Sequence, residues 1–139
     1  MTRRALWMLL LLGLACGPRP VAGPDSPGLR PAEVATGFAV AVLGHARADE
    51  ALLWSEPGAA LDVRSQVGFL AVPGREVRYR VEQPRQEAGA WTVPVTIQSL
   101  ELGEARYQGQ MLLRLAPDGR RVRSSGLELE RSDGVKVSL

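Results

Sequence analysis

Residues 91–98 read Trp-Thr-Val-Pro-Val-Thr-Ile-Gln, and this stretch decides the fold. The odd-numbered positions hold Trp, Val, Val and Ile, whereas the even-numbered positions hold Thr, Pro, Thr and Gln. A period of two places these two sets on opposite faces of a β-strand, so one face is predicted to be buried. Pro94 lacks an N–H group to donate to a neighbouring strand, which predicts that it lies at an edge or a bulge.

The same alternation continues on both sides of this stretch. Strands are expected over residues 77–82, 106–115, 121–130 and 135–139. Two turn sequences, Pro117-Asp118-Gly119 and Ser132-Asp133-Gly134, separate the last three of these strands. Short turns of this kind join neighbouring antiparallel strands, so the second half of the chain is predicted to form an antiparallel sheet with one buried face.

Residues 31–70 follow a helical period instead. A first helix is expected to begin near Pro31, because proline suits the first helical turn, and to be ended by Gly44 and the charged stretch Arg47-Ala-Asp-Glu50. One face of this helix repeats at spacings of three and four: Val34, Phe38, Ala41, Val42 and His45.

Two shorter helices are expected after it, with Asp49 and Asp62 as their N-caps and with Pro57-Gly58 between them. Helices followed by a run of antiparallel strands predict the α+β class.

The N-terminus is predicted to carry an export signal. A cation pair at Arg3 and Arg4 precedes an apolar run from Ala5 to Ala15, and Cys16 follows at once. The run is too short to cross a bilayer, which takes about 20 residues, but it suits a signal peptide. The pattern resembles the lipobox of bacterial lipoproteins, which implies cleavage before Cys16 and acylation of its sulfur, although Gly13 stands where that family prefers a branched residue.

Together with the composition of the following residues, these features divide the chain into three predicted parts. Residues 1–15 form the signal peptide, residues 16–30 form a Pro/Gly-rich flexible tether, and residues 31–139 form one domain. The expected location is the cell envelope, either the outer membrane or the periplasmic face if the organism is Gram-negative. The alternatives are ordinary secretion with cleavage near residues 20–22, or an uncleaved anchor.

The charge of the mature chain argues against one class of partner. The whole chain has 17 basic and 15 acidic residues, and the two basic residues of the signal peptide leave with it, so 15 of each remain. Nucleic-acid-binding domains present a strongly basic face, so no nucleic-acid partner is expected.

The order of elements also resembles the nuclear transport factor two-like superfamily. The residues that carry this likeness are Pro31-Ala-Glu-Val34 with Phe38, Ala48-Asp49 with Leu52-Leu53-Trp54, and the alternating strands as far as Asp118-Gly119. The resemblance implies a strongly curved antiparallel sheet that forms a cone-shaped half-barrel around the N-terminal helices. Its members include isomerases, cyclases and dehydratases as well as proteins without catalysis, so the fold alone does not assign an activity.

Catalysis in such a cone would need an acid or base together with a polarising group. The candidates are His45 or Asp49 acting with Tyr79 or Tyr107. Each also has a structural interpretation: His45 as a surface or capping residue, Asp49 as an N-cap, and the tyrosines as core residues. Because His45 is the only histidine, no histidine cluster is available, and neither a metal nor a cofactor is expected.

Charged residues are expected on the outer sheet face. Five arginines are candidates for a basic surface toward the envelope: Arg78, Arg80, Arg114, Arg121 and Arg123. The alternative is a solvated face on which Glu82, Glu87 and Glu101 neutralise them.

The function expected from these features is a non-catalytic, lipid-anchored envelope protein that binds a small apolar ligand or a protein partner. The alternatives are an isomerase- or dehydratase-type enzyme and a structural accessory of an envelope complex. The sequence leaves a homodimer open.

Overall fold

The computed structural model describes residues 23–139. The predicted signal peptide and Cys16 lie outside the described residues. No helix in the described part is long and apolar enough to cross a membrane.

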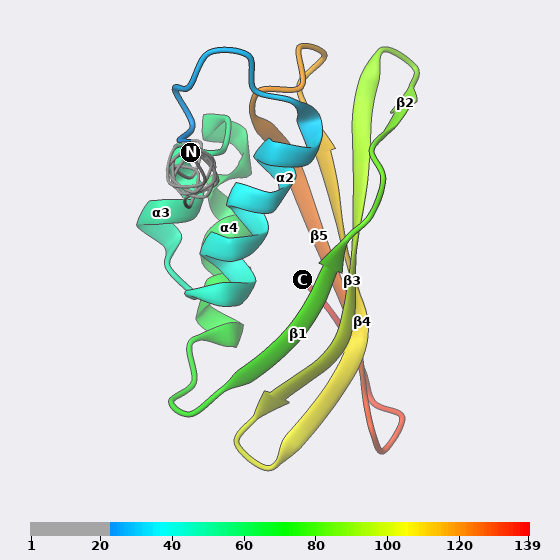
Figure 1. Cartoon of the computed structure of the whole chain (residues 1–139). Coiled ribbons are helices and arrows are strands. Elements are labelled where there is room, and N and C mark those ends of the chain that lie inside the picture. The colour runs from blue at the N-terminus through cyan, green and yellow to red at the C-terminus, as the bar shows by residue number, and fades with distance from the viewer. Residues whose placement is uncertain (1–22) are drawn as a thin grey trace, which may run out of the picture.

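Helices come first and strands follow (Figure 1). The helical segments are α2 (Pro31–Ala39), the π-helix η1 (Val40–Gly44), α3 (Ala48–Leu53), the 3-10 helix η2 (Pro57–Ala59) and α4 (Ala60–Leu70). The strands are β1 (Glu76–Val81), β2 (Arg85–Glu87), β3 (Ala90–Leu102), β4 (Ala105–Leu115), β5 (Val122–Arg131) and β6 (Lys136–Ser138). The predicted α+β class is confirmed.

The six strands form one antiparallel sheet in the order β1-β3-β4-β5-β6, and β2 also pairs with β3. Pro94 is predicted at an edge or a bulge. The edge position is wrong, because β3 is a central strand between β1 and β4, and the register shift of β3 lies between Ile97 and Leu100 rather than at Pro94. The N–H of Glu82 donates to the carbonyl of Pro94 at 2.9 Å. The edge of Pro94 that lacks an N–H therefore faces the gap in the neighbouring strand between the end of β1 and the start of β2. The N–H that Pro94 lacks is therefore not needed for strand pairing at this point, because the neighbouring strand is interrupted there.

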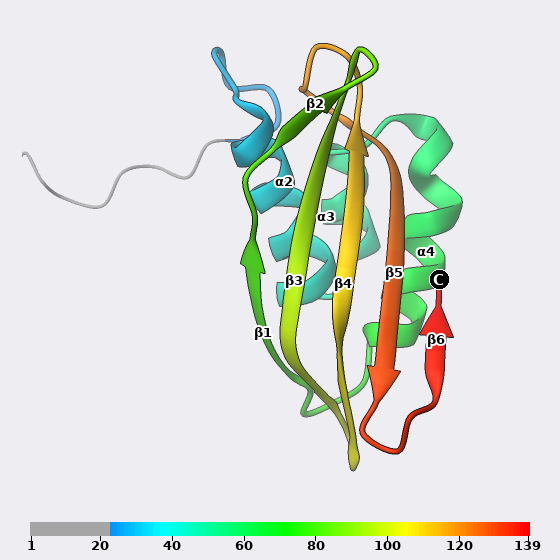
Figure 2. The ribbon, with the colours of Figure 1, turned by 90° about the vertical axis from the view of Figure 1, so that its right-hand side faces the viewer.

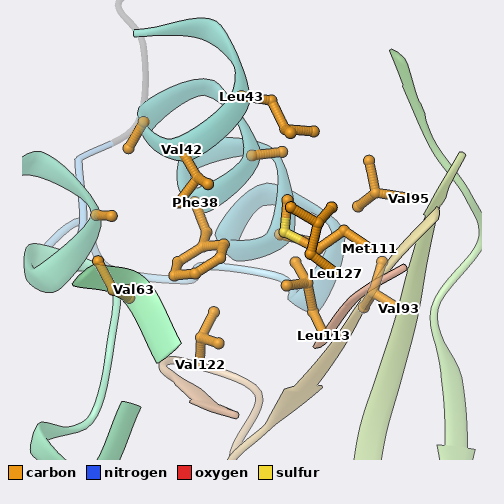
Figure 3. Close-up of a cluster of buried hydrophobic side chains, with 14 of the residues drawn as sticks. Phe38, Val42, Leu43, Val63, Val93, Val95, Met111, Leu113, Val122 and Leu127 are labelled. Atoms are coloured by element: carbon orange, nitrogen blue, oxygen red, sulfur yellow. The ribbon is translucent and has the colours of Figure 1, made fainter. Parts of the chain in front are cut away.

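The helices cover one face of the sheet and leave the other face open (Figure 2). The layer between them is filled by apolar side chains, of which Phe38, Leu43, Met111, Leu113 and Leu127 are fully buried (Figure 3). Burial of this layer supplies the main driving force for folding, at about 25 cal/mol for each Å² of apolar surface removed from water.

Two expected N-caps are wrong. The residue before α3 is Arg47 and the residue before α4 is Ala59, and neither caps its helix through a side chain. Asp49 and Asp62 instead lie in the first turns of these helices, where a carboxylate still meets the positive end of the helix dipole.

His45 also departs from its predicted place on the buried helix face. The chain forms a π-turn over Val40–Gly44, which holds more residues per turn than an α-helix, so the three-and-four period no longer applies at residue 45. His45 is the C-cap of this turn, and its side chain is 53% exposed. The position fits the capping interpretation of this residue.

The sheet bends along a line that crosses three strands. Register shifts lie between Arg78 and Tyr79 in β1 and between Ile97 and Leu100 in β3. The next strand has Gly109 at the same level, where an added Cβ would lie 2.0 Å from the Glu128 carbonyl oxygen. Bulges and close-packed glycines are the usual means by which a sheet curves.

Part of the predicted tether is attached to the domain. Arg120 Nη2 donates to the Ser26 carbonyl at 3.0 Å, and Arg121 Nη1 donates to the Pro24 carbonyl at 2.8 Å. Leu29 is buried in the core. Residues 23–30 are therefore held against the turn between β4 and β5, where the sequence predicted a flexible segment.

Candidate functional site

The open face of the sheet is polar and continuous across the strands. Residues paired in register form two neighbouring rows on this face, which we call the Thr96 row and the Gln108 row. The Thr96 row consists of Arg80, Thr96, Gln110, Glu128 and Ser138. The Gln108 row consists of Arg78, the bulge Gln98–Ser99, Gln108, Glu130 and Lys136.

A hollow of about 860 Å³ lies over the β4, β5 and β6 side of this face. Side chains of both rows line it, among them Gln108, Gln110, Glu128, Glu130 and Lys136. A second hollow of about 280 Å³ adjoins it over Gly126 and shares Gln110 and Glu128 with it. Both hollows are outside the helix–sheet interior, whose central side chains are buried.

Charges are unevenly distributed over the open face. Its β1 side carries Arg78 and Arg80, and its β5 side carries Glu128 and Glu130. Arg80 pairs with Glu82 at 2.9 Å. Within residues 23–139, Arg78, Glu128 and Glu130 have no ion-pair partner within 4 Å. The β1 side of the face thus carries the cation Arg78, whereas its β5 and β6 side carries the carboxylates Glu128 and Glu130 together with Lys136, which lies opposite Glu130.

Glu82 is held in its charged form at the β1 side. A hydrogen bond from Arg80 and a second from the Thr96 hydroxyl, both at 2.9 Å, lower the pKa of the Glu82 carboxyl. These hydrogen bonds outweigh the opposing effect of desolvation.

The predicted acid/base candidates on the helices are both engaged with neighbouring charges. His45 Nδ1 lies 2.9 Å from both carboxylate oxygens of Glu50, a residue that sequence reasoning had not singled out. Asp49 is 72% exposed and pairs with Arg47 at 3.1 Å, and this hydrogen bond lowers the pKa of the Asp49 carboxyl. A carboxylate that orients an imidazole is one element of acid/base chemistry, although within the described chain no hydrogen bond joins His45 or Asp49 to a tyrosine.

The two tyrosines lie on the helix-facing side of the sheet. Tyr107 is 7% exposed and packs edge to face on Phe69, with ring centroids 5.6 Å apart. Tyr79 is half-buried near Gly44, and desolvation raises the pKa of its hydroxyl. Both packings fit the structural interpretation of core aromatics.

The five candidate arginines do not form one surface. Arg78 and Arg80 project from β1, and Arg114 lines the smaller hollow. Arg121 holds the segment before α2 through Pro24 and through Asp25, and Arg123 pairs with Glu56 at 3.2 Å. Only the first three therefore remain on the open face.

The residues that sequence reasoning missed on this face are Gln108 and Gln110, which lie between the arginines and the glutamates. Their signal was present, because both occupy the polar positions of the β4 alternation. The described part of the chain contains no group of three or more His, Cys, Asp or Glu side chains that could hold a metal.

Comparison with known proteins identified no matching family, no similar curated protein and no similar solved structure.

Proposed function

We propose that this chain is a non-catalytic, lipid-anchored envelope protein that binds a protein partner through the open face of its sheet. The observation that carries the proposal is the contrast between the two faces of the sheet. One face is packed against the helices. The other face is uncovered and polar, and it carries two adjoining hollows that share Gln110 and Glu128. A broad face with several polar contact groups suits a protein surface better than a small apolar ligand.

The sequence supports the anchor. The cation pair, the apolar run and Cys16 stand at the start of the chain, and only six residues separate Cys16 from Gly23. Six linking residues reach about 20–25 Å when fully extended, so an acylated chain would keep the domain beside the bilayer.

We also propose that the bend through Gly109 gives the sheet the shape of a half-barrel cone. The register shifts in β1 and β3 support this shape, since they lie at the same level as the close approach of Gly109 to β5.

Two measurements test the proposed function. Cys16→Ser is expected to abolish fatty-acid labelling and to release the chain from membranes. Wild-type protein is expected to retain a protein partner during extraction in mild detergent, and Glu128→Arg/Glu130→Arg is expected to lose it. Unchanged labelling would contradict the anchor, and unchanged capture would contradict the binding face.

A further inference from the structure

We propose that an exposed apolar patch at the turn between α3 and α4 rests on the bilayer that holds the N-terminal anchor, so that the helical side of the domain faces the lipid. This inference rests on the proposed function, since it uses the lipid anchor and assigns an orientation to the anchored domain.

Two of the exposed apolar side chains lie close together in the chain. Within residues 23–139 the large exposed ones are Leu53 at 61%, Leu61 at 80% and Val135 at 45% exposure. A single exposed leucine is common on protein surfaces. Here, however, Leu53 ends α3 and Leu61 lies in the first turn of α4, so the two leucines flank one short connection.

The surface between the two leucines carries no exposed charge. The exposed residues of the range 53–61 are Leu53, Pro57, Gly58 and Leu61, which we call the Leu53 patch. Glu56 is the one charged residue in this range, and it pairs with Arg123 at 3.2 Å. An uncharged apolar area of this kind suits contact with the boundary between lipid headgroups and acyl chains.

Hydrogen bonds hold this part of the helical layer against the start of β5. The Val122 N–H donates to the Trp54 carbonyl at 2.8 Å, and the Glu56 N–H donates to the Val122 carbonyl at 2.8 Å. The Asp62 carboxylate accepts a hydrogen bond from the Ser125 N–H at 3.3 Å. Each leucine of the patch directly precedes one of these bonded residues, Trp54 or Asp62, so both leucines lie beside the first four residues of β5.

The N-terminal segment is attached at the same place. Arg121 directly precedes Val122, and its guanidinium donates to the Pro24 carbonyl at 2.8 Å. Only six residues separate Cys16 from Gly23, which is a reach of about 20–25 Å. The segment that leads to the proposed anchor therefore joins the domain at the end of β5 where the Leu53 patch lies.

Val135 lies at the other end of this strand. Strand β5 runs from Val122 to Arg131, and its ten residues extend over about 30 Å. The Arg131 N–H bonds to the Val135 carbonyl at 2.7 Å, so this valine is placed beyond that far end. Val135 is thus an exposed apolar side chain that the proposed orientation keeps away from the lipid.

A cation accompanies the patch. Arg64 is exposed on α4 one turn after Leu61, and within the described chain it has no carboxylate within 4 Å. Arginine beside exposed leucines suits a bilayer with anionic headgroups. The patch belongs to the helical layer, which covers the opposite side of the sheet from the open face (Figure 2). A bilayer at the patch therefore leaves the open face accessible to a protein partner.

The experiment attaches a polarity-sensitive fluorophore to the full acylated chain in vesicles of phosphatidylethanolamine and phosphatidylglycerol. Gly58→Cys places the fluorophore in the patch, and Gly126→Cys places it on the open face as the matched control. A Cβ at either glycine meets nothing within 4 Å. Cys16 is the only cysteine of the chain and its acylated sulfur is blocked, so each variant has one reactive thiol.

Lipids brominated in their acyl chains quench a fluorophore that touches them. The fluorophore at position 58 is expected to lose at least half of its emission in brominated vesicles, whereas the fluorophore at position 126 should keep its emission. Adding Leu53→Ser/Leu61→Ser to Gly58→Cys should reduce the quenching at least twofold, while adding Val135→Ser should leave it unchanged. Circular dichroism and thermal melting show that each variant is folded.

Three results would overturn the proposed orientation. They are an unquenched fluorophore at position 58, quenching that survives the double leucine substitution, and equal quenching at positions 58 and 126. A fluorophore at position 58 that responds in native membranes but not in pure lipid would overturn it as well, because a protein would then cover the patch.

Flotation of the vesicles separates this inference from the proposed anchor. If the acylated chain floats and the fluorophore at position 58 is unquenched, the anchor stands and the inference fails. If the Cys16→Ser chain floats equally well and its fluorophore at position 58 is quenched, the patch binds lipid and the anchor fails. If neither chain floats, both fail.

Discussion

The side chain of Gln66 in α4 binds Ser125 in β5 twice. Gln66 Nε2 donates to the Ser125 carbonyl at 2.8 Å, and the Ser125 hydroxyl donates to Gln66 Oε1 at 2.8 Å. Asp62, one turn earlier on the helix, accepts a hydrogen bond from the Ser125 N–H at 3.3 Å. Strand β6 pairs with β5 only at Glu128–Glu130. At Ser125, where β5 has no strand partner on this side, the side chains of α4 instead satisfy the backbone N–H and carbonyl.

Replacing Gln66 by leucine should destabilise the domain by about 2–4 kcal/mol, because the buried Ser125 carbonyl and hydroxyl would lose their partners while the side-chain volume is nearly kept. Urea unfolding followed by circular dichroism measures the change. The double variant Gln66→Leu/Ser125→Ala should recover part of this loss, since one unsatisfied group is then absent. Equal stability of Gln66→Leu and wild type would contradict the role of this pair.

Gly37 in α2 provides a matched comparison with Gly68 in α4. A Cβ at Gly37 would lie 2.3 Å from the ring of Trp54, whereas a Cβ at Gly68 would meet nothing within 4 Å. Alanine is favoured over glycine in a helix by about 1 kcal/mol. Gly68→Ala is therefore expected to raise the melting temperature, whereas Gly37→Ala is expected to lower it.

Trp54→Leu in the Gly37→Ala background separates the clash from other causes. The smaller side chain leaves room for the new methyl group, so the further loss caused by Gly37→Ala should shrink in that background. An equal loss in both backgrounds would show that Trp54 is not the obstacle.

Gly109 should be intolerant of any side chain because β4 approaches β5 there. Gly109→Ala places a Cβ against the Glu128 carbonyl and forces the two strands apart, so we expect a loss of about 2 kcal/mol or more in the free energy of unfolding. Gly126→Ala is the control on the neighbouring strand, since a Cβ there meets nothing within 4 Å. Similar stability of the two variants would exclude a close strand contact at Gly109.

The turn between β5 and β6 should respond to acid. A hydrogen bond from Arg131 lowers the pKa of the Asp133 carboxyl to about 2, and the Val135 N–H adds to the effect. Because the pKa is lower in the folded state than its usual value near 3.9, this contribution to stability is present above pH 4 and is lost as the pH falls toward 2.

NMR titration of the Asp133 carboxyl carbon is expected to give a midpoint near 2 in the folded chain. Asp133→Asn should remove the acid-dependent change at the Arg131 and Val135 amide signals. A midpoint near 4 would contradict the ion pair at this turn.

Arg121 should control the segment before α2 rather than the stability of the core. Arg121→Met removes the hydrogen bond to the Pro24 carbonyl and the ion pair with Asp25 at 3.0 Å. Amide hydrogen exchange near residues 25–30 is expected to accelerate, while the free energy of unfolding changes by less than about 1 kcal/mol. Unchanged exchange would show that Arg121 does not hold this segment.

Much of this architecture was present in the amino-acid sequence. The alternation at residues 91–98, the turns at Gly119 and Gly134 and the helix start at Pro31 all correspond to observed elements. These signals are local, because side-chain periodicity and turn geometry depend on residues only a few positions apart. The buried face of the sheet follows from the same periodicity, and so does the polar character of the open face.

Other features depended on which surfaces meet in three dimensions. Pro94 is tolerated in a central strand because the edge that lacks an N–H faces the break between β1 and β2. His45 is exposed to solvent because the helix widens into a π-turn directly before it. The pairing of Gln66 with Ser125 joins residues 59 positions apart. No local pattern encodes such a contact, since its energy exists only after the helix and the strand have packed together.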